Sequence, residues 1–331
     1  MNQPPALTVA ATIERWPIAG TFTISRGAKT EAAVVVATVG DGVATGRGEC
    51  VPYARYGESV ESVAAAIEGL APHLAAGLTR AALQQTLPPG AARNALDCAL
   101  WDLEAKRRGK PVHMLAGLPA PTARVTCYTI SLDTPDAMQA AAERVAARKL
   151  LKVKLGRDGD PQRIAAVRRG APNAELVVDA NEGWSAETLA ANVAACADAG
   201  VTLIEQPLPA DRDGALRGFR SPVLLCADES VHARPSLHGL RDKYGAVNIK
   251  LDKTGGLTEA LVMAHDARQA GLRIMAGCMV GTSLAMAPAM LIAQQADVVD
   301  LDGPLLLARD REHGLVYRDS MVGAPVPALW G

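Results

Sequence analysis

LLKVKLG, at residues 150–156, is the first of five short apolar runs that each end in charged side chains. The four runs that follow it are LVVDAN (176–181), TLIEQP (202–207), VLLCADES (223–230) and AVNIKLDK (246–253). Their charged residues lie 22 to 26 residues apart, and they are Lys154, Asp179, Glu205, Asp228 and Lys250. One strand, one loop and one helix of a (β/α) barrel use about that length of chain. The spacing therefore predicts five successive barrel units with a charged residue at the same point of each.

Three further apolar runs complete a set of eight candidate strands, and they are VTCYTIS (125–131), RIMAGCM (273–279) and DVVDLD (297–302). Helical patterns lie between the strands, for example at 186–199 before Gly200 and at 257–270 before Gly271. Alternation of strands and helices implies a parallel sheet with right-handed crossovers. We therefore expect an α/β fold, with a (β/α)7β-type TIM barrel over residues 121–312.

Residues 1–120 have a different organisation. AAVVVATV (32–39), a GDG turn and VATGRGEC (43–50) predict an antiparallel meander, and helical patterns follow at 59–74 and 92–109. Strands followed by helices indicate an α+β capping domain. Residues 313–331 contain no further barrel unit, so we expect this tail to pack back onto the cap.

Composition argues against several classes of partner. The chain has 331 residues with 34 basic and 35 acidic side chains, so nothing in its charge favours nucleic acid or an anionic membrane. No signal-peptide pattern is present, nor any apolar run of roughly 18 residues that would span a membrane. The six cysteines are scattered and form no CxxC motif, as is typical of reduced thiols. We expect a cytoplasmic protein that acts on a small molecule, and we leave open whether it is a homo-oligomer.

Strand geometry brings the charged residues together. Side chains at i and i+2 of a strand share a face, so Lys152 lies beside Lys154 and Asp300 lies beside Asp302. Burying such groups in a barrel is costly unless they are paired or bind an ion. Carboxylate oxygens are the ligands that Mg²⁺ prefers. We therefore expect one Mg²⁺ held by three carboxylates from adjacent strands, which are Asp179, Glu205 and Asp228.

A magnesium ion and lysine bases together suit one kind of reaction. The ion would polarise a substrate carboxylate and stabilise the enediolate that forms when the adjacent carbon loses a proton. Lysine can remove that proton if nearby positive charge lowers its pKa to about 7–8. Lys154 and Lys250 would lie half a barrel apart and face each other across the mouth. The expected reaction is removal of a proton on one side of a carbon and its return on the other.

Plainer explanations exist for each residue by itself. A single acid at a strand end is more often a helix cap or a surface group, and a KxK pair is more often solvated. Unrelated surface residues would rarely place a charge at the same position of five successive units, so we favour the functional interpretation.

The motifs resemble those of the enolase superfamily, in its muconate-lactonizing subgroup, where a lysine base works with magnesium. That subgroup carries KxK, Asp-x-Asn, Glu, Asp and Lys on successive strands. Within it the chain closely resembles the dipeptide epimerases, especially the bacterial L-Ala-D/L-Glu epimerases, over essentially its whole length. The supporting motifs are KVKLG, VDANEGW, EQPLP, ADES, VNIKLDKTGGLTEA, GCMVGTS and DLDGP.

The resemblance implies an activity and further site residues. It implies a Mg²⁺-dependent isomerase with one ion per subunit, which inverts the C-terminal α-carbon of L-Ala-L-Glu or L-Ala-D-Glu in murein (peptidoglycan) peptide metabolism. Lys154 and Lys250 would exchange base and acid roles, and Lys152 would neutralise the substrate carboxylate. The resemblance also implies four kinds of substrate contact: the α-ammonium group on Asp300 and Asp302, contacts from Thr129, a backbone contact from Cys278, and the glutamyl carboxylate on Arg26.

Alternatives remain at this stage. One aspartate of DLDGP could cap the following turn, and Arg26 could be an exposed loop residue. KTGGLT (253–258) could bind phosphate at a helix start, although we prefer a tight turn. A lyase of the same superfamily, such as a muconate cycloisomerase or an o-succinylbenzoate synthase, is the main functional alternative, and a non-catalytic dipeptide-binding protein is a third.

Overall fold

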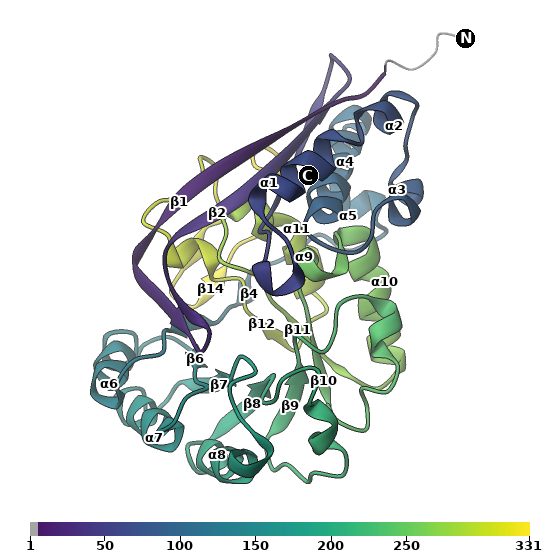
Figure 1. The fold of residues 1–331 in the computed structure, drawn as a ribbon. Coiled ribbons are helices and arrows are strands. Elements are labelled where there is room, and N and C mark those ends of the chain that lie inside the picture. Colours follow the sequence, from purple (N-terminus) through teal and green to yellow (C-terminus); the bar gives the residue numbers. More distant parts are fainter. Residues whose placement is uncertain (1–5) are drawn as a thin grey trace.

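Eight parallel strands form the central sheet of the structure, a computed structural model that describes residues 6–331 (Figure 1). They are β5 (Tyr128–Ile130), β6 (Leu150–Lys154), β7 (Glu175–Asp179), β8 (Val201–Glu205), β9 (Leu224–Ala227), β10 (Ala246–Ile249), β11 (Arg273–Ala276) and β12 (Val298–Val299). Strands adjacent in sequence are adjacent in the sheet. The amide of Cys127 donates to the carbonyl of Val299 at 2.8 Å, which joins the first strand to the last. The predicted barrel of eight strands is confirmed.

Helices follow most of the strands, as predicted. They are α6 (Pro135–Arg144), α7 (Asp160–Gly170), α8 (Ala186–Asp198), α9 (Leu251–Thr254), α10 (Leu257–Gln269) and α11 (Ser283–Ala293). Short 3-10 turns replace the helices after β8, β9 and β12, and they are η2 (Asp213–Leu216), η3 (Arg234–Leu237) and η4 (Gly303–Leu306). The regular spacing of the strands along the sequence therefore does not imply a full helix in every barrel unit. Prolines such as Pro207, Pro209 and Pro235 interrupt helix formation in those segments. Among residues 6–331, no helix has the length and apolar character needed to cross a membrane.

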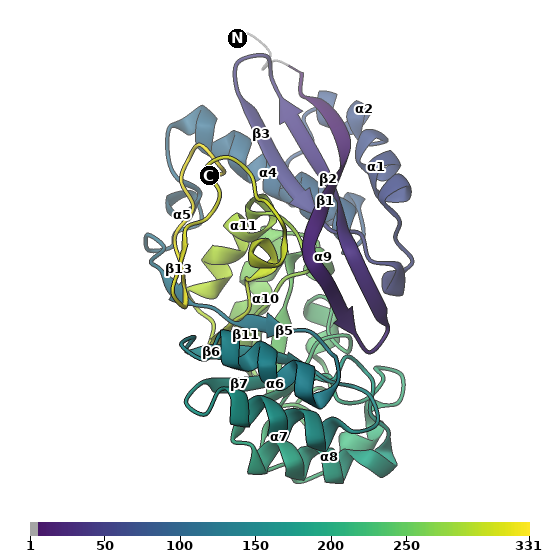
Figure 2. The same cartoon turned by 90° about the vertical axis from the view of Figure 1, so that its left-hand side faces the viewer.

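The cap is an antiparallel sheet covered by helices, which confirms the predicted meander. Its strands, in the order β1-β2-β3, are β1 (Thr8–Ile24), β2 (Gly27–Gly40) and β3 (Thr45–Cys50). Its helices are η1 (Ala54–Tyr56), α1 (Val60–Glu68), α2 (Ala71–Ala75), α3 (Arg80–Thr86), α4 (Ala91–Arg108) and α5 (Val112–Leu115). The helix predicted at 59–74 is thus two helices. The long β1–β2 hairpin reaches from the cap to the barrel (Figures 1 and 2), where the amide of Leu132, between β5 and α6, donates to the carbonyl of Thr23 at 3.0 Å.

Helix α4 packs unusually close to strand β3. A Cβ atom on Gly48 would lie 2.2 Å from the carbonyl oxygen of Ala95 and 2.7 Å from the amide nitrogen of Ala99. A Cβ atom on Gly46 would overlap the backbone of the same helix one turn further along. The two glycines of GRGE are therefore required by the approach of a helix backbone.

The C-terminal tail contacts both parts of the chain. Strands β13 (Tyr317–Arg318) and β14 (Met321–Val322) extend β4 (Arg124–Val125) into a small antiparallel sheet. The indole of Trp330 donates to the carbonyl of Cys98 in α4 at 3.0 Å, and the carbonyl of Gly331 accepts from the amide of Val112 at 3.1 Å. These contacts attach the tail to the cap helices. The domain boundaries at residues 120 and 312 stay a prediction.

The inside of the barrel is apolar at one end and polar at the other. A lower cluster takes one side chain from each strand or from the residue just before it: Cys127, Leu150, Val177, Leu203, Cys226, Ala246, Met275 and Val298. Two residues further along the chain, on the same face, come Thr129, Lys152, Asp179, Glu205, Asp228, Asn248, Gly277 and Asp300. The apolar cluster closes the bottom of the barrel, so the charged groups gather at the carboxyl ends of the strands.

The packing of α4 on β3 predicts the effect of adding one methyl group. We expect Gly48→Ala to lower the free energy of unfolding by about 2–3 kcal/mol, because the new Cβ would overlap the α4 backbone. Gly214→Ala is the matched control, since a Cβ there meets no atom within 4 Å, and it should change stability by less than about 0.5 kcal/mol. Urea unfolding of both variants measures the difference, and equal stabilities would show that the close approach is absent.

Candidate active site

The lysines and carboxylates predicted from the strand ends lie together in the upper layer of the barrel. Lys152 Nζ is 2.6 Å from Asp300 Oδ2, 2.6 Å from Glu205 Oε2 and 3.4 Å from Asp179 Oδ2. All four of these side chains are buried. The ammonium group of Lys152 is therefore the centre of a cluster drawn from four strands.

Two more lysines flank the row of carboxylates. Lys154 Nζ is 2.7 Å from Asp179 Oδ2, and Lys250 Nζ is 2.6 Å from Asp228 Oδ2 and 3.6 Å from Glu205 Oε1. Strands β7, β8 and β9 separate β6 from β10, so the two amines stand at opposite ends of the row. Phe22 of the cap hairpin covers Lys154, with the ring centroid 5.7 Å from Nζ.

Charge crowding shifts the titration of these groups. Burial disfavours the charged forms of Lys152 and Lys250, but the neighbouring carboxylates outweigh it and raise the pKa of both amines above the usual value. The lowered pKa expected for a lysine base beside a bound magnesium ion stays a prediction. Burial and the nearby Asp179 raise the pKa of Glu205 to about 7. The lysine ammonium groups of the cluster therefore do not fully compensate the negative charge of its carboxylates.

The donor set suits a hard divalent cation once the amines move aside. Within residues 6–331, no three acidic, histidine or cysteine side chains are close enough to clasp one ion as they stand, because lysine amines lie between the carboxylates. Buried oxygens without a hydrogen-bond partner nevertheless gather here, and they are Asn181 Oδ1, Glu229 Oε2, Asn248 Oδ1 and Asp300 Oδ1, while Glu205 Oε2 faces the ammonium group of Lys152. An all-oxygen set with unsatisfied acceptors fits Mg²⁺, which takes oxygen ligands.

The second aspartate of DLDGP does not cap the turn that follows it. Asp302 precedes η4, but its side chain makes no cap hydrogen bond; Oδ2 instead accepts from the amide of Thr129 at 2.6 Å. Burial and the neighbouring Asp300 raise the pKa of Asp302 to about 7. The turn-cap alternative is therefore wrong, and both carboxylates face the cavity together with Thr129 and Cys278.

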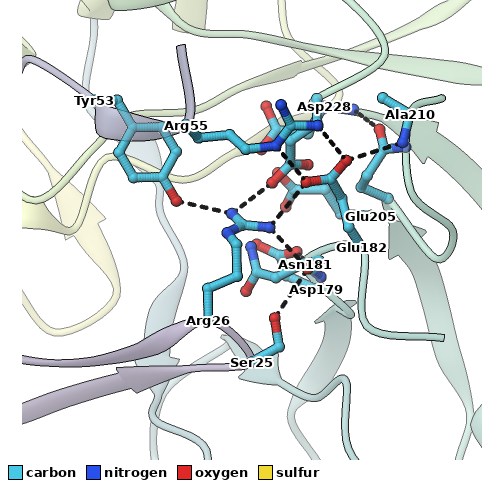
Figure 3. Close-up of polar contacts among 12 residues, drawn as sticks. Ser25, Arg26, Tyr53, Arg55, Asp179, Asn181, Glu182, Glu205, Ala210 and Asp228 are labelled. Atoms are coloured by element: carbon cyan, nitrogen blue, oxygen red, sulfur yellow. Dashed lines mark hydrogen bonds and ion pairs between the residues drawn. The ribbon is translucent and has the colours of Figure 1, made fainter. Parts of the chain in front are cut away.

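Arg26 lies at the tip of the cap hairpin and reaches the mouth of the site (Figure 3). Its guanidinium donates to the carbonyl of Asn181 at 2.8 Å, to Glu229 Oε1 at 2.7 Å and to the hydroxyl of Tyr53 at 2.8 Å. It also lies 3.2 Å from Glu182 Oε2. Arg26 is thus a loop residue that is still partly exposed, but its guanidinium already binds several protein groups, so its role toward a substrate stays a prediction.

A cavity of about 620 Å³ joins these groups. The cap supplies one wall of it and the strand ends supply the other, and its volume suits a small organic ligand. The residues of interest that line it are Arg26, Thr129, Lys152, Lys154, Lys250, Cys278, Asp300 and Asp302. The structure thus brings every predicted substrate-binding residue and both predicted bases to one cavity.

Sequence reasoning missed two buried residues that hold the carboxylates. Lys253 donates to Asp228 Oδ1, to the carbonyl of Asp228 at 2.6 Å and to that of Asn248 at 3.0 Å. Asn248 Nδ2 donates to Glu205 Oε1 at 2.6 Å. Strand alternation could have found Asn248, which shares a face with Lys250. Lys253 lies past the strand, in α9, so strand alternation could not have found it. It reaches Asp228 because α9 turns back over the end of the barrel.

The glycine pair of KTGGLT is a tight turn, as preferred. Gly255 and Gly256 have φ values of 74° and 110° between α9 and α10. Cβ atoms there would fall 2.4 Å from Arg93 Nε and 2.5 Å from Asp97 Cβ, both in cap helix α4. The turn seats the segment that carries Lys250 against the cap.

Comparisons with known proteins agree with this geometry. Residues 6–117 match the family model "Mandelate racemase / muconate lactonizing enzyme, N-terminal domain", and residues 137–326 match "Enolase C-terminal domain-like". The L-Ala-D/L-Glu epimerase of Escherichia coli is 49% identical over 94% of this chain and 97% of its own. An N-acetyl-D-glutamate racemase from a Pseudoalteromonas species is 46% identical over 90% of this chain and 95% of its own.

A solved structure is similar over almost the full chain. It is an enolase family member from Agrobacterium tumefaciens with homology to dipeptide epimerases, crystallised with sodium and L-Ala-L-Glu. Its identity to this chain is 56% and the TM-score is 0.96, with 98% of this chain and 100% of that chain covered.

The charge cluster predicts how the protein responds to loss of its central amine. We expect Lys152→Met to lower the free energy of unfolding by about 3–5 kcal/mol near pH 8, because it leaves buried carboxylates without a partner. The pKa of Glu205 is already raised to about 7, so its ionised form opposes folding increasingly as pH rises toward that value. The loss of stability should therefore be smaller near pH 5.5. Lys149→Met, at an exposed lysine just before β6, is the control, and a Lys152 variant as stable as this control at both pH values would contradict the account.

Proposed function

Since the chain belongs to the mandelate racemase/muconate lactonizing enzyme branch of the enolase superfamily, we propose that it is a magnesium-dependent dipeptide epimerase. It inverts the α-carbon of the C-terminal residue in L-Ala-L-Glu and L-Ala-D-Glu. The observation that carries the proposal is the row of carboxylates Asp179, Glu205 and Asp228 with a buried lysine at each end. Binding alone would need neither of these lysines.

The two flanking lysines move the proton. Lys154 removes the α-hydrogen from one face of the carbon and Lys250 returns a proton to the other, and the roles reverse for the opposite substrate configuration. Each amine must leave its carboxylate partner to reach the reacting carbon. Phe22 over Lys154 helps to exclude water from the reacting carbon.

Asp179, Glu205 and Asp228 would hold Mg²⁺ once the amines swing away. The bound ion would stabilise the negative charge that develops on the substrate carboxylate as the proton leaves. Lys152, which contacts both Glu205 and Asp300, would stay as the cation beside that carboxylate. Lys253 and Asn248 keep Asp228 and Glu205 in position from behind.

The ends of the dipeptide are recognised by opposite charges. Asp300 and Asp302 seat the α-ammonium group, because two carboxylates on one side of the cavity suit a cation. Thr129 and Cys278 line the same cavity, and we assign the Cys278 contact with the substrate to its backbone. Arg26 takes the glutamyl carboxylate; its Nε–H makes no hydrogen bond within residues 6–331 and is available for a new acceptor.

The cellular setting follows from this chemistry. L-Ala-D-Glu units occur in murein peptides, so we place the enzyme in murein peptide metabolism. We place it in the cytoplasm, in keeping with six cysteines that are all free. A homo-oligomer stays an open prediction.

Racemisation of N-acetylglutamate is the second candidate, favoured by the relative with that activity that is 46% identical. The same lysines and Arg26 would serve it. An acetyl group carries no ammonium for Asp300 and Asp302, so these two aspartates favour the dipeptide. Lyases of the superfamily act on substrates that also lack this group.

The proposal predicts stereochemical proton exchange. With Mg²⁺ in heavy water, the protein should exchange the C-terminal α-hydrogen of L-Ala-L-Glu and L-Ala-D-Glu for deuterium, which mass spectrometry and NMR measure. Lys154→Ala and Lys250→Ala should each lower interconversion by at least about 10³-fold, because each removes one base. A panel of L-Ala-X dipeptides would define the range of substrates.

The same panel contains the alternatives. Exchange of N-acetylglutamate without exchange of any dipeptide would move the assignment to the second candidate. Turnover of a muconate or succinylbenzoate precursor, with no exchange on any dipeptide, would move it to the lyases.

The proposed metal site predicts a cation-dependent gain in stability. Mg²⁺ at 100 times its dissociation constant should stabilise the protein by about 2.7 kcal/mol, and thermal unfolding with and without EDTA measures this effect. Asp228→Asn should abolish the gain because it removes a ligand charge. Glu175→Gln, at the far end of β7, is the control that should keep it. An equal gain in both variants would place the cation elsewhere.

A further inference from the structure

We propose that Glu182 is a positioning residue that holds two loops of the cap over the site by binding Arg26 and Arg55 at once. The first loop is the β1–β2 hairpin tip (residues 24–27), and the second is the 50s loop (residues 51–58). The proposal rests on the proposed function in one respect, which is that Arg26 takes the acidic side chain of the substrate.

Glu182 lies on the barrel, in the turn that follows β7. Its backbone φ is 63°, next to Asn181 with a φ of 47°, and its amide donates to the carbonyl of Gln206 at 2.9 Å. Two successive non-glycine residues in the left-handed region are uncommon, and such backbone persists where surrounding contacts require it. The turn therefore presents the Glu182 carboxylate toward the cap in a fixed orientation.

The carboxylate receives donors from three separate segments (Figure 3). Arg55 binds it in a bidentate manner, with Nε 3.0 Å from Oε2 and Nη2 3.0 Å from Oε1. Arg26 Nη1 lies 3.2 Å from Oε2, and the amide of Ala210 donates to Oε1 at 2.9 Å. Burial would raise the pKa of Glu182, but the arginines and the Ala210 amide outweigh it and lower the pKa, so the group is an anion.

The difference in burial between the carboxylate and the two arginines explains why the carboxylate is the anchor. The Glu182 side chain is 9% exposed, whereas those of Arg26 and Arg55 are 28% and 40% exposed. An ion pair between two mobile exposed groups contributes little, because both side chains lose freedom to form it. Here the anion is already fixed by the barrel, so only the loop side chains have to be ordered.

Other contacts also hold the two loops near the Glu182 turn. Ser25 Oγ donates to the carbonyl of Asn181 at 2.9 Å, so the hairpin tip rests on the Glu182 turn. Tyr56 of the 50s loop packs edge-on against His232 of the barrel, with ring centroids 4.4 Å apart. Arg26 also donates to Tyr53, which links the loops directly. Among residues 6–331, Glu182 is the one carboxylate to which an arginine from each loop binds.

Hydrogen exchange on the substrate-free protein tests the anchor without reference to activity. In Glu182→Gln, amide exchange in peptides covering residues 20–30 and 51–58 should speed up together, roughly ten-fold, because hydrogen bonds to a charged group are lost. Glu175→Gln, at the opposite end of the same strand, should leave both segments at the parent rate. If Glu182→Gln does not fold, Arg55→Met replaces it and should release residues 51–58 much more than residues 20–30.

Steady-state kinetics then tests the consequence for substrate binding. Glu182→Gln should raise KM for L-Ala-L-Glu roughly ten-fold and change kcat by less than about three-fold, because the lost contact serves substrate and transition state alike. Unchanged exchange in both loops, release of only one loop in Glu182→Gln, or an equal effect in Glu175→Gln would overturn the proposal. If the parent protein turns over no dipeptide, the proposed function fails, while the exchange data still decide on the anchor.

Discussion

Pairing between buried amines and buried carboxylates is the constraint on which the rest of this structure depends. Lys152, Lys154, Lys250 and Lys253 are buried, and each pairs with a carboxylate at the carboxyl end of a barrel strand. Removing any one partner would leave a charge without compensation at low dielectric. The barrel must therefore keep its strand register, because a slip of one residue would turn these groups to the opposite face. The arrangement that makes the site chemically useful also makes it structurally demanding.

The architecture supports this cluster from below and from above. The apolar layer from Cys127 to Val298 closes the barrel beneath the charges, and the cap closes it above through Phe22, Arg26 and the 50s loop. Helix α4 connects these functions, since it packs against β3 through Gly48 and seats the glycine turn behind Lys250. Proton transfer at a single carbon requires this enclosure, because water would otherwise compete for the developing charge.

Much of this was predictable from the sequence because two periodicities coincide in it. The repeat of 22 to 26 residues indicated the barrel units, and the alternation of KVK and DLD indicated which side chains point inward. The 3-10 turns after β8 and β9 were not predicted, since the repeat length is the same whether a helix or a proline-rich loop fills it. Lys253, Glu229 and Glu182 were missed because their importance arises from contacts between segments far apart in the chain. The raised pKa of Lys250 was missed for a related reason, as it depends on how near Asp228 lies.

The central claim is that the paired lysines become opposed bases over one carbon, and a crystal structure with Mg²⁺ and L-Ala-L-Glu tests it most directly. The account predicts Lys154 Nζ and Lys250 Nζ on opposite faces of the glutamyl α-carbon, each within about 3.5 Å of it. It also predicts that Asp179, Glu205 and Asp228 have exchanged their lysine partners for one ion. Both amines on the same face of the carbon, or still bound to their carboxylates with the ion elsewhere, would contradict it.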